Sequence, residues 1–311
     1  MIIECKNCST RLKVDESLLK PQGSKVRCSN CSEIFLVKPP SVESAETSSA
    51  PKSGKPKKVS AVIALSNQKG GVAKTTTCLN LGISFALMKK RVLLVDFDVQ
   101  ASLSSCLGFQ HSLSFYEAIT SGDRKIDRAI RKTRYPNLWL VPSNRNMVNL
   151  NKKYFGAKNF EYVLMEKLAP IKEKFDFILI DTPPSMEFYT LNALTAADWV
   201  IIPSNCEFLS TQGVHQTVNF MSAIEANTNP GIDYRILVTM YDGRDTVSKL
   251  IYAKLKKMYG DKNYRTVIGV DNKIRESQVM RTPVIYYYKH SRSALQYVTL
   301  AREIIGDLSN D

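Results

Sequence analysis

Short apolar runs alternate with helical stretches along the chain from about residue 59 onward. The helical stretches include TTTCLNLGISFALMKK (75–90). Strands that are apolar on both faces and alternate with helices predict an α/β fold, with a mostly parallel sheet flanked by helices. The predicted strands are VSAVIALS (59–66), RVLLVDFD (91–98), LWLVPS (138–143), FDFILID (175–181), WVIIPSN (199–205), YRILVTMYD (234–242) and, more weakly, TVIGV (266–270).

The first 58 residues follow a different pattern. Residues 39–58, PPSVESAETSSAPKSGKPKK, are rich in Pro, Ser, Lys and Ala and contain no aromatic residue. Such a segment buries too little apolar surface to fold, so we expect a flexible linker. The chain is therefore expected to consist of a small unit at 1–38, the linker at 39–58 and a large domain at 59–311.

Four of the seven cysteines form two C-x-x-C pairs near the N-terminus, Cys5 with Cys8 and Cys28 with Cys31. Each pair can turn on a tight knuckle, and two knuckles complete a tetrahedral zinc site. Disulfides and an iron–sulfur centre are the other interpretations, and structural zinc is favoured over both. With four thiolate ligands, no coordination position is left open for catalysis. The isolated Cys78, Cys106 and Cys206 are expected to be plain core or surface residues.

Residues 1–37 resemble the small zinc-ribbon domain found at the N-terminus of various bacterial proteins. The shared features are the first C-x-x-C, a V-D-E-S-L segment, V-R-C-x-x-C and a hydrophobic end. The resemblance implies little about function, because such ribbons bind partners, nucleic acid or neither. A transcriptional regulator that uses the ribbon is therefore one function class to test, and it predicts DNA binding by residues 1–38 alone.

Positive charge is concentrated in two regions. The chain carries a formal net charge of +14, which suggests an anionic partner such as nucleic acid or a membrane surface. Residues 244–302 hold 13 Lys or Arg against 4 Asp or Glu, and residues 1–60 hold 11 against 6. This distribution favours a binding surface over general solubility. Neither a transmembrane run nor a secretory signal is evident, so we expect a cytoplasmic protein with reduced cysteines.

The stretch SNQKGGVAKTTT (66–77) predicts a phosphate-binding loop between a strand and a helix. It departs from the common G-x-x-x-x-G-K-[ST] pattern, because Gln68 and Ala73 stand at the two glycine positions. A glycine pair there still lets backbone N–H groups face a ligand, and the helix N-terminus adds a positive dipole. Lys74 can then reach the β- and γ-phosphates, and the Thr75 hydroxyl can bind Mg²⁺.

The segment KGGVAKTT resembles the deviant Walker A motif, K-G-G-x-x-K-[ST], of the ParA/MinD ATPases. DFDVQ (96–100), ILIDTPPS (178–185), VTMYDGRDTVS (238–248) and the tail segment 266–297 resemble further motifs of that family in the same order, and the resemblance covers about residues 61–306. Three differences stand out. Val99 replaces a proline, a triplet near the base is replaced by Gly269, Val270 and Asp271, and Lys273 stands where an arginine is expected. The residues that contact adenine are therefore not assigned.

The resemblance implies a homodimer closed around two ATP molecules. Lys69 would reach across the interface to the partner's ATP phosphates, while Lys74 would serve the nucleotide of its own chain. A lysine supplied in trans neutralises charge on the γ-phosphoryl group and makes dimerisation and ATP binding interdependent. Thr76 would hydrogen-bond the α-phosphate. The residues expected to contact the nucleotide are Lys69, Gly70, Gly71, Val72, Ala73, Lys74, Thr75 and Thr76.

Three carboxylates complete the expected catalytic site. By the same resemblance, Asp98 would orient or activate the attacking water, and an alternative role for it is a helix N-cap. Asp96 and Asp181 end parallel strands beside the loop, where they can hold Mg²⁺ through water. ATP hydrolysis is expected to be slow in isolation and stimulated by a ParB-like or other adaptor protein, which would carry a chromosome, a plasmid or a protein cluster as cargo.

ParA-type dimers bind DNA without sequence preference through basic residues of the C-terminal part, which suggests a nucleoid-associated bacterial protein. Lys273, Arg275 and Arg292 are the expected contacts, with Arg244 as a fourth or as a neighbour of the nucleotide. The main alternative is a MinD-like membrane cycle, which needs a basic amphipathic C-terminal helix. The last predicted helix, 293–306, instead carries an apolar stripe typical of core packing, so no membrane binding is expected.

Overall fold

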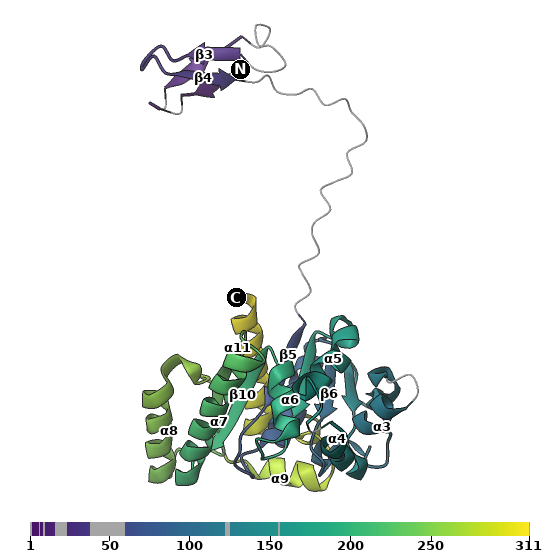
Figure 1. Ribbon diagram of the computed structural model, residues 1–311. Helices are drawn as coiled ribbons and strands as arrows, with labels where there is room; N and C mark the ends of the chain where they lie inside the picture. Colours follow the sequence, from purple (N-terminus) through teal and green to yellow (C-terminus); the bar gives the residue numbers. More distant parts are fainter. Residues whose placement is uncertain are drawn as a thin grey trace. The chain divides into compact units, whose positions relative to one another are not determined.

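The computed structural model describes residues 2–5, 7–8, 10–15, 24–37, 60–121, 125–154 and 156–310. The chain divides into two compact units, Met1–Pro56 and Lys57–Asp311, as Figure 1 illustrates. The linker expected at 39–58 lies outside the described residues.

The small N-terminal unit contains two antiparallel β-hairpins. Strand β1 (Ile2–Glu4) pairs with β2 (Arg11–Lys13), and β3 (Ser24–Arg27) pairs with β4 (Ile34–Val37). Each hairpin carries one C-x-x-C pair in its turn, and a backbone hydrogen bond closes each turn, from Cys5 N to Thr10 O at 3.0 Å and from Cys28 N to Glu33 O at 2.8 Å. The hairpins therefore present their cysteines from tight turns, as the spacing predicts.

A seven-stranded sheet forms the centre of the large unit within the described residues. The strand order is β11-β10-β5-β9-β6-β8-β7, and every neighbouring pair is parallel except the antiparallel β7–β8 pair at one edge. The strands are β5 (Ala61–Leu65), β6 (Val92–Asp96), β7 (Arg131–Lys132), β8 (Leu138–Val141), β9 (Phe177–Asp181), β10 (Trp199–Asn205) and β11 (Asp233–Thr239).

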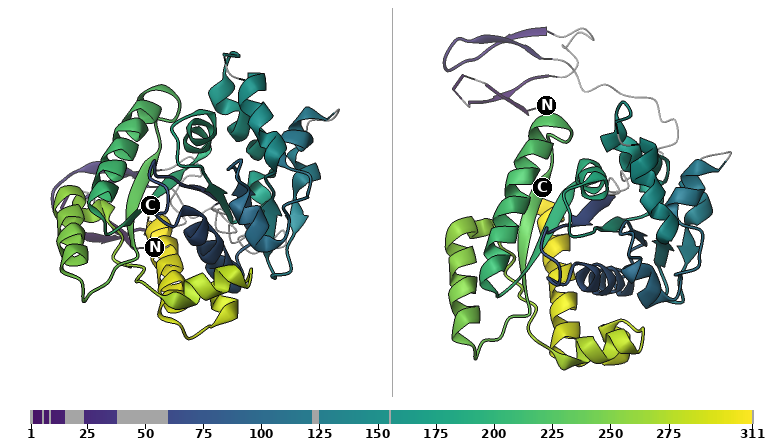
Figure 2. Two further views of the ribbon diagram at one scale, coloured as in Figure 1. Left: turned by 90° about the horizontal axis from the view of Figure 1, so that it is seen from below. Right: turned by 60° about the horizontal axis from the view of Figure 1, so that its bottom comes forward.

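Helices cover both faces of this sheet, as the views in Figure 2 show. The α-helices are α1 (Lys74–Leu87), α2 (Ser102–Leu107), α3 (Phe115–Thr120), α4 (Val148–Tyr154), α5 (Val163–Leu168), α6 (Phe188–Ala196), α7 (Phe208–Asn227), α8 (Thr246–Tyr259), α9 (Asn272–Val279), α10 (Val284–Tyr287) and α11 (Arg292–Asn310). Short 3₁₀-helices are η2 (Ile126–Ala129), η3 (Arg145–Met147), η4 (Phe160–Tyr162), η5 (Ala169–Lys174) and η6 (Gly260–Lys262). No helix among the described residues combines the length and apolarity that crossing a bilayer requires.

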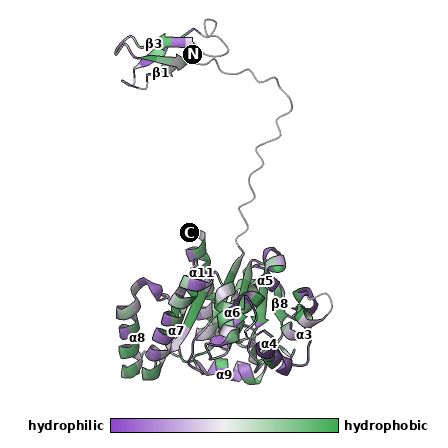
Figure 3. Ribbon diagram, in the orientation of Figure 1, coloured by the Kyte–Doolittle hydropathy of each residue, from purple (hydrophilic) through white to green (hydrophobic). Residues whose placement is uncertain are grey.

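The central strands are buried on both faces because successive side chains point to opposite sides. In β5, Val62 and Ala64 join a hydrophobic cluster with residues of α3 to α8. Ala61, Ile63 and Leu65 join a second cluster, with residues of α1, α2, α10 and α11. Figure 3 shows how hydrophobic residues gather on these strands. The predicted α/β class with a mostly parallel sheet is confirmed.

Some predicted elements differ from the structure. The segment 266–270 is not a strand, because it meets the chain after β11 through a single bridge between Tyr241 and Gly269. The edge strand β7 is too short to stand out as an apolar run. Residues 286–288 lie in and just after the short helix α10, and Tyr286 packs on Tyr135 with ring centroids 4.7 Å apart.

Candidate functional site

The phosphate-binding loop connects the carboxyl end of β5 to the start of α1. Parallel strands place their carboxyl ends at one edge of a sheet, where loops can meet around a ligand. Gly71 has a φ of 75°, and Ala73 takes the N-cap position of α1 with a φ of 69°. Alanine is disfavoured in this left-handed region, where the common loop pattern places a glycine. Ala73 therefore adopts the backbone conformation of a phosphate loop, at a local cost in conformational energy.

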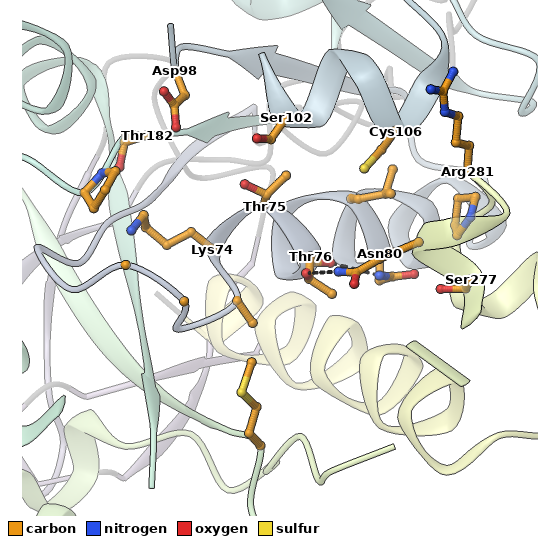
Figure 4. Close-up of a pocket in the computed structure, with 18 of the residues that line it drawn as sticks. Lys74, Thr75, Thr76, Asn80, Asp98, Ser102, Cys106, Thr182, Ser277 and Arg281 are labelled. Atoms are coloured by element: carbon orange, nitrogen blue, oxygen red, sulfur yellow. Dashed lines mark hydrogen bonds between the residues drawn. The ribbon is translucent and has the colours of Figure 1, made fainter. Parts of the chain in front are cut away.

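A cavity of about 390 Å³ opens above this loop and the first turns of α1, and Figure 4 shows its lining. Six residues of the predicted nucleotide set line it, together with Asp98: Gly70, Gly71, Ala73, Lys74, Thr75 and Thr76. Val72 lies beneath the loop, fully buried, and its carbonyl oxygen accepts from the Thr239 hydroxyl at 3.2 Å. This hydrogen bond joins the backbone of the loop to the end of β11.

Lys74 is held by the loop that it follows. Its ammonium donates to the carbonyl oxygens of Asn67 at 2.9 Å and Lys69 at 3.2 Å. Burial lowers the pKa of Lys74, and the nearby carboxylates of Asp181 and Asp98 act in the opposite direction. A phosphate group in the cavity would also favour the charged form of this lysine.

The Lys69 side chain contacts the end of β10 and the start of α7. Its ammonium donates to the Glu207 carboxylate at 2.5 Å, the Ser210 hydroxyl at 2.8 Å and the Asn205 side-chain oxygen at 3.4 Å. These groups lie at the end of β10 and the start of α7. The interaction with Lys69 lowers the pKa of Glu207. Lys69 does not line the cavity that Lys74 and Thr75 share.

Asp181 and Thr75 provide oxygen atoms suited to a divalent cation. Both carboxylate oxygens of Asp181 are buried and have no hydrogen-bond partner among the described residues. Burial raises the pKa of Asp181 well above its usual range, and the charge of Asp96 adds to this effect. Because Mg²⁺ prefers oxygen ligands and would favour the ionised carboxylate, these residues fit a magnesium site.

Asp96 is fully engaged by the protein. One of its oxygens accepts from the Ser104 backbone N–H at 2.7 Å and the Ser104 hydroxyl at 2.6 Å, and the other accepts from the Asp98 N–H at 3.3 Å. Burial raises the pKa of Asp96 to about 7, although the hydrogen bonds from Ser104 oppose the shift. Its observed contacts therefore anchor α2 to the sheet beside the proposed cation site.

Asp98 lies across the cavity from Thr75. One carboxylate oxygen accepts from the Gln100 N–H at 2.9 Å, and the backbone carbonyl accepts from the Ser143 hydroxyl. The helix that follows, α2, has Ala101 as its N-cap, so Asp98 does not cap it. The Asp98 carboxylate is thus held in the cavity wall.

The four predicted DNA contacts fall into different surroundings. Arg244 forms a two-point ion pair with Asp242, and its side chain is 91% exposed. Lys273 pairs with Glu276 at 2.7 Å. Arg292 donates to the carbonyl oxygen of Val270. Arg275 is exposed and lines a small cavity beside the loop.

Sequence reasoning missed several residues of the site because they carry no motif. Asn205, Glu207 and Ser210, which hold Lys69, follow the carboxyl end of β10, and that position is the signal that could have identified them. A second cavity of about 170 Å³ adjoins the loop at Ala73 and Thr76. Its further lining residues are Thr239, Met240, Ile268, Gly269, Val270, Asp271, Ile274, Arg275, Gln278 and Tyr297.

The four predicted metal ligands of the small unit come together. The Sγ atoms of Cys5, Cys8, Cys28 and Cys31 lie within 4.8 Å of one another. The Cys5–Cys31 and Cys8–Cys28 sulfur atoms are each 3.6 Å apart, too far for a disulfide bond. Four thiolates converging from two knuckles fit a structural zinc ion. Cys78 and Cys206 are buried and Cys106 is half-buried.

A strand, a glycine-containing loop and a helix that starts with Lys74 and Thr75, next to buried aspartates on neighbouring strands, define a P-loop nucleoside triphosphatase. The sequence pattern of the AAA domain family matches residues 60–234, more than half of the chain, and that of a zinc-ribbon domain matches residues 1–36. The chain belongs to this AAA-domain family and carries an N-terminal zinc ribbon.

Proteins of similar sequence identify the group to which the chain belongs among the P-loop nucleoside triphosphatases. The chain is 35% identical over 250 residues to the sporulation initiation inhibitor protein Soj of Bacillus subtilis, covering 79% of this chain and 98% of Soj. It is 33% identical over 251 residues to the chromosome partitioning protein ParA of Caulobacter vibrioides, covering 79% of this chain and 94% of ParA. The chain is a member of the ParA group of ATPases, as its motifs predict.

A solved structure of similar sequence agrees with the fold. The cobyrinic acid a,c-diamide synthase of Mycobacterium smegmatis with bound ADP and magnesium has a TM-score of 0.67 and 32% sequence identity. The match covers 79% of this chain and 94% of that protein. The matched region thus includes most of the ATPase unit.

Proposed function

We propose that this protein is a dimerising ATPase that binds DNA non-specifically in its ATP state and positions or segregates DNA or a protein cargo. The observation that carries the proposal is the placement of Lys69 outside the cavity served by Lys74. Two lysines five residues apart thus have different surroundings, and the Lys69 side chain is 22% exposed. A lysine that lies near a phosphate site without lining it suits a nucleotide held by a second copy of the chain.

The inner cavity supports ATP as the ligand. The loop and Lys74 would bind the β- and γ-phosphates, and Thr75 and Asp181 would hold Mg²⁺, which supplies charge neutralisation between the phosphates. The similar M. smegmatis protein was solved with ADP and magnesium. The cavity of about 170 Å³ next to Thr76 is the proposed position of the base, with Met240 and Ile268 among the residues that line it.

Hydrolysis would depend on the placement of one water molecule. Asp98 would accept a hydrogen bond from the attacking water, while Lys74 and the partner's lysine stabilise charge on the transferring group. We expect slow turnover in isolation because the loop lysines are engaged by protein groups. A ParB-like or other adaptor protein would accelerate the reaction by stabilising the closed dimer.

An arginine-lined groove supports DNA as the anionic partner. The groove has a volume of about 820 Å³, and Arg265, Arg292 and Arg302 line it together with Glu303, which pairs with Arg265 at 3.4 Å. Two of these arginines are additional to the four residues predicted as DNA contacts. Arginine side chains that contact phosphates give sequence-independent, salt-sensitive affinity. Exposed Arg275 and Arg244 lie in the same C-terminal part of the chain.

A gel-shift titration tests the proposal with random-sequence duplex DNA at several salt concentrations. We expect tight, salt-sensitive binding with ATP, weak binding with ADP, and weak binding of the Lys69→Ala variant with either nucleotide. Lys89→Ala, an exposed lysine just after α1, serves as the matched control. Equal DNA binding in all nucleotide states, or ATP-dependent binding by Lys69→Ala, would contradict the proposal.

The membrane-cycling alternative receives little support from the last helix. Helix α11 buries Ala294, Tyr297, Leu300, Ala301 and Ile304 in the core of the ATPase unit. Its apolar stripe is therefore occupied by packing and is not available to a bilayer. A transcriptional regulator that uses the ribbon would instead predict DNA binding by residues 1–38 alone.

A further inference from the structure

Two cavities meet at the start of α1, and Ala73, Thr76, Met240 and Gln278 line both of them. Thr76 and Gln278 line both the larger cavity of about 390 Å³ and the smaller one of about 170 Å³. Thr76 belongs to the first turn of α1, whereas Gln278 comes from α9, some 200 residues later in the chain. The Gln278 side-chain amide donates to the Thr76 hydroxyl oxygen at 2.9 Å. Figure 4 shows Thr76 and its hydrogen bonds beside the loop.

This hydrogen bond restricts the direction of the Thr76 hydroxyl proton. A hydroxyl group has one proton and two lone pairs, and here one lone pair is used by Gln278. The proton therefore points away from that amide. Among the residues that the structure describes, none accepts it, and the Thr76 backbone carbonyl is taken by the Asn80 side chain at 2.9 Å. An acceptor in the cavities is thus the natural partner of this proton.

We propose that Gln278 is a positioning residue for the nucleotide, acting through Thr76. By donating to the Thr76 oxygen, it leaves the Thr76 proton free for an anionic phosphate oxygen of the nucleotide. The two hydrogen bonds form a chain from amide to hydroxyl to phosphate, in which each bond polarises the next. A bond to a charged phosphate oxygen is stronger than one between neutral groups. The inference rests on the proposed ATP site and adds a residue that the loop motif does not contain.

The position of Gln278 in α9 favours this role over a purely structural one. Helix α9 is secured at its start by Asp271, which caps it through the Lys273 N–H and also accepts from the Ser293 hydroxyl at 2.7 Å. Ser277 bonds within the helix, to the carbonyl oxygen of Ile274. Gln278 itself is exposed at the cavity mouth, so its side chain adds little to the packing of the helix.

The test measures binding of Mg-ADP and Mg-ATP to the full chain by calorimetry. Gln278→Met has a similar length and lacks the donor, and we expect its affinity for both nucleotides to fall about twofold to tenfold. Gln278→Glu should lose more, because its carboxylate would accept the Thr76 proton and turn it away from the phosphate. Val279→Met, at the neighbouring position of α9 with 83% exposure, is the control and should bind as the wild type does.

A double-mutant cycle separates positioning from packing. In a Thr76→Ala background, Gln278→Met should cause no further loss, whereas in Thr76→Ser, which keeps the hydroxyl, the loss should return. The KM for ATP should rise while kcat changes less than twofold, since the contact is to a part of the nucleotide that does not react. Unchanged affinity in Gln278→Met, or an equal loss in the Thr76→Ala background, would overturn the inference. A wild-type chain that binds no nucleotide would instead refute the proposed function.

Discussion

At the scale of single residues, the loop departs from the common phosphate-loop sequence while keeping its geometry. Ala73 has a left-handed backbone that a glycine adopts without strain, and Gly71 has a positive φ as well. The two lysines of the loop, Lys69 and Lys74, have different partners. The motif resemblance predicts that both lysines matter, but only the structure assigns them different partners, Glu207 for one and the loop carbonyls for the other.

Replacing Ala73 with glycine should stabilise the fold. Alanine in the left-handed region costs about 1 kcal/mol, partly offset because glycine adds freedom to the unfolded chain. We expect Ala73→Gly to raise the free energy of unfolding by about 0.5 kcal/mol, measured by urea denaturation of the ATPase transition. Ala86→Gly, in the right-handed last turn of the same helix, should lower it by about 1 kcal/mol. Destabilisation by both variants would contradict the strain assigned to Ala73.

At the scale of elements, the strands and the first helix were predictable because buried parallel strands are continuous apolar runs. The segment 266–270 misled prediction, since its apolar residues pack beside β11 without forming a ladder. The carboxylates Asp98 and Asp181 could be placed from motifs at strand ends. Asn205, Glu207 and Ser210, which hold Lys69, were missed because they carry no motif, and only their position after the carboxyl end of β10 marks them.

Helix α1 is joined to the C-terminal helices by polar side chains on successive turns. Besides Thr76, the Thr77 hydroxyl lies 3.3 Å from the Tyr297 hydroxyl of α11, and the Asn80 side-chain oxygen accepts from the Val284 N–H at 2.9 Å. The helix that follows the phosphate loop is therefore coupled directly to the segments that carry the proposed DNA-binding arginines.

Removing the Asn80 amide should weaken this connection. Asn80 is 2% exposed, and Asn80→Ala would leave the Val284 N–H at the start of α10 without a partner. Such an unsatisfied buried group costs about 1–3 kcal/mol. We expect the free energy of unfolding to fall by roughly 2 kcal/mol, while the exposed Asn272→Ala of α9 has little effect. Equal stability of the two variants in urea titrations would argue against a stabilising hydrogen bond between Asn80 and Val284.

At the scale of the whole molecule, the two units are stabilised by different means. The ATPase unit has two extensive hydrophobic clusters, one on each face of its sheet. The ribbon is too short to build a comparable core and depends on its four cysteines. The C-x-x-C spacing was sufficient to predict the metal site, because two knuckles leave little freedom for anything else. The short hairpins of the ribbon carry no comparable sequence pattern that identifies its binding partner.

Metal removal should affect one unit only. We expect one zinc per chain by elemental analysis, and none in a Cys28→Ser variant. In that variant, backbone amides of residues 24–37 should lose protection against hydrogen exchange, because a ribbon without metal cannot hold its hairpins. Affinity for Mg-ADP should stay within twofold of the wild type, since every residue of the nucleotide site lies in the other unit. Iron in place of zinc, or unchanged protection in Cys28→Ser, would contradict the assignment.

Because Lys69 contacts Glu207, the surface charge of the single chain should differ from that of the proposed ATP-bound dimer. All three protons of the Lys69 ammonium are used by Glu207, Ser210 and Asn205, so a phosphate of a second chain would have to replace at least one of them. If Glu207 is the group replaced, each proposed dimer would release two carboxylates that the single chain keeps neutralised. Closing around ATP would thus expose a pair of negative charges at the starts of the two α7 helices. An adaptor protein with a basic segment could bind the ATP-bound dimer through these two carboxylates, without contacting the nucleotide.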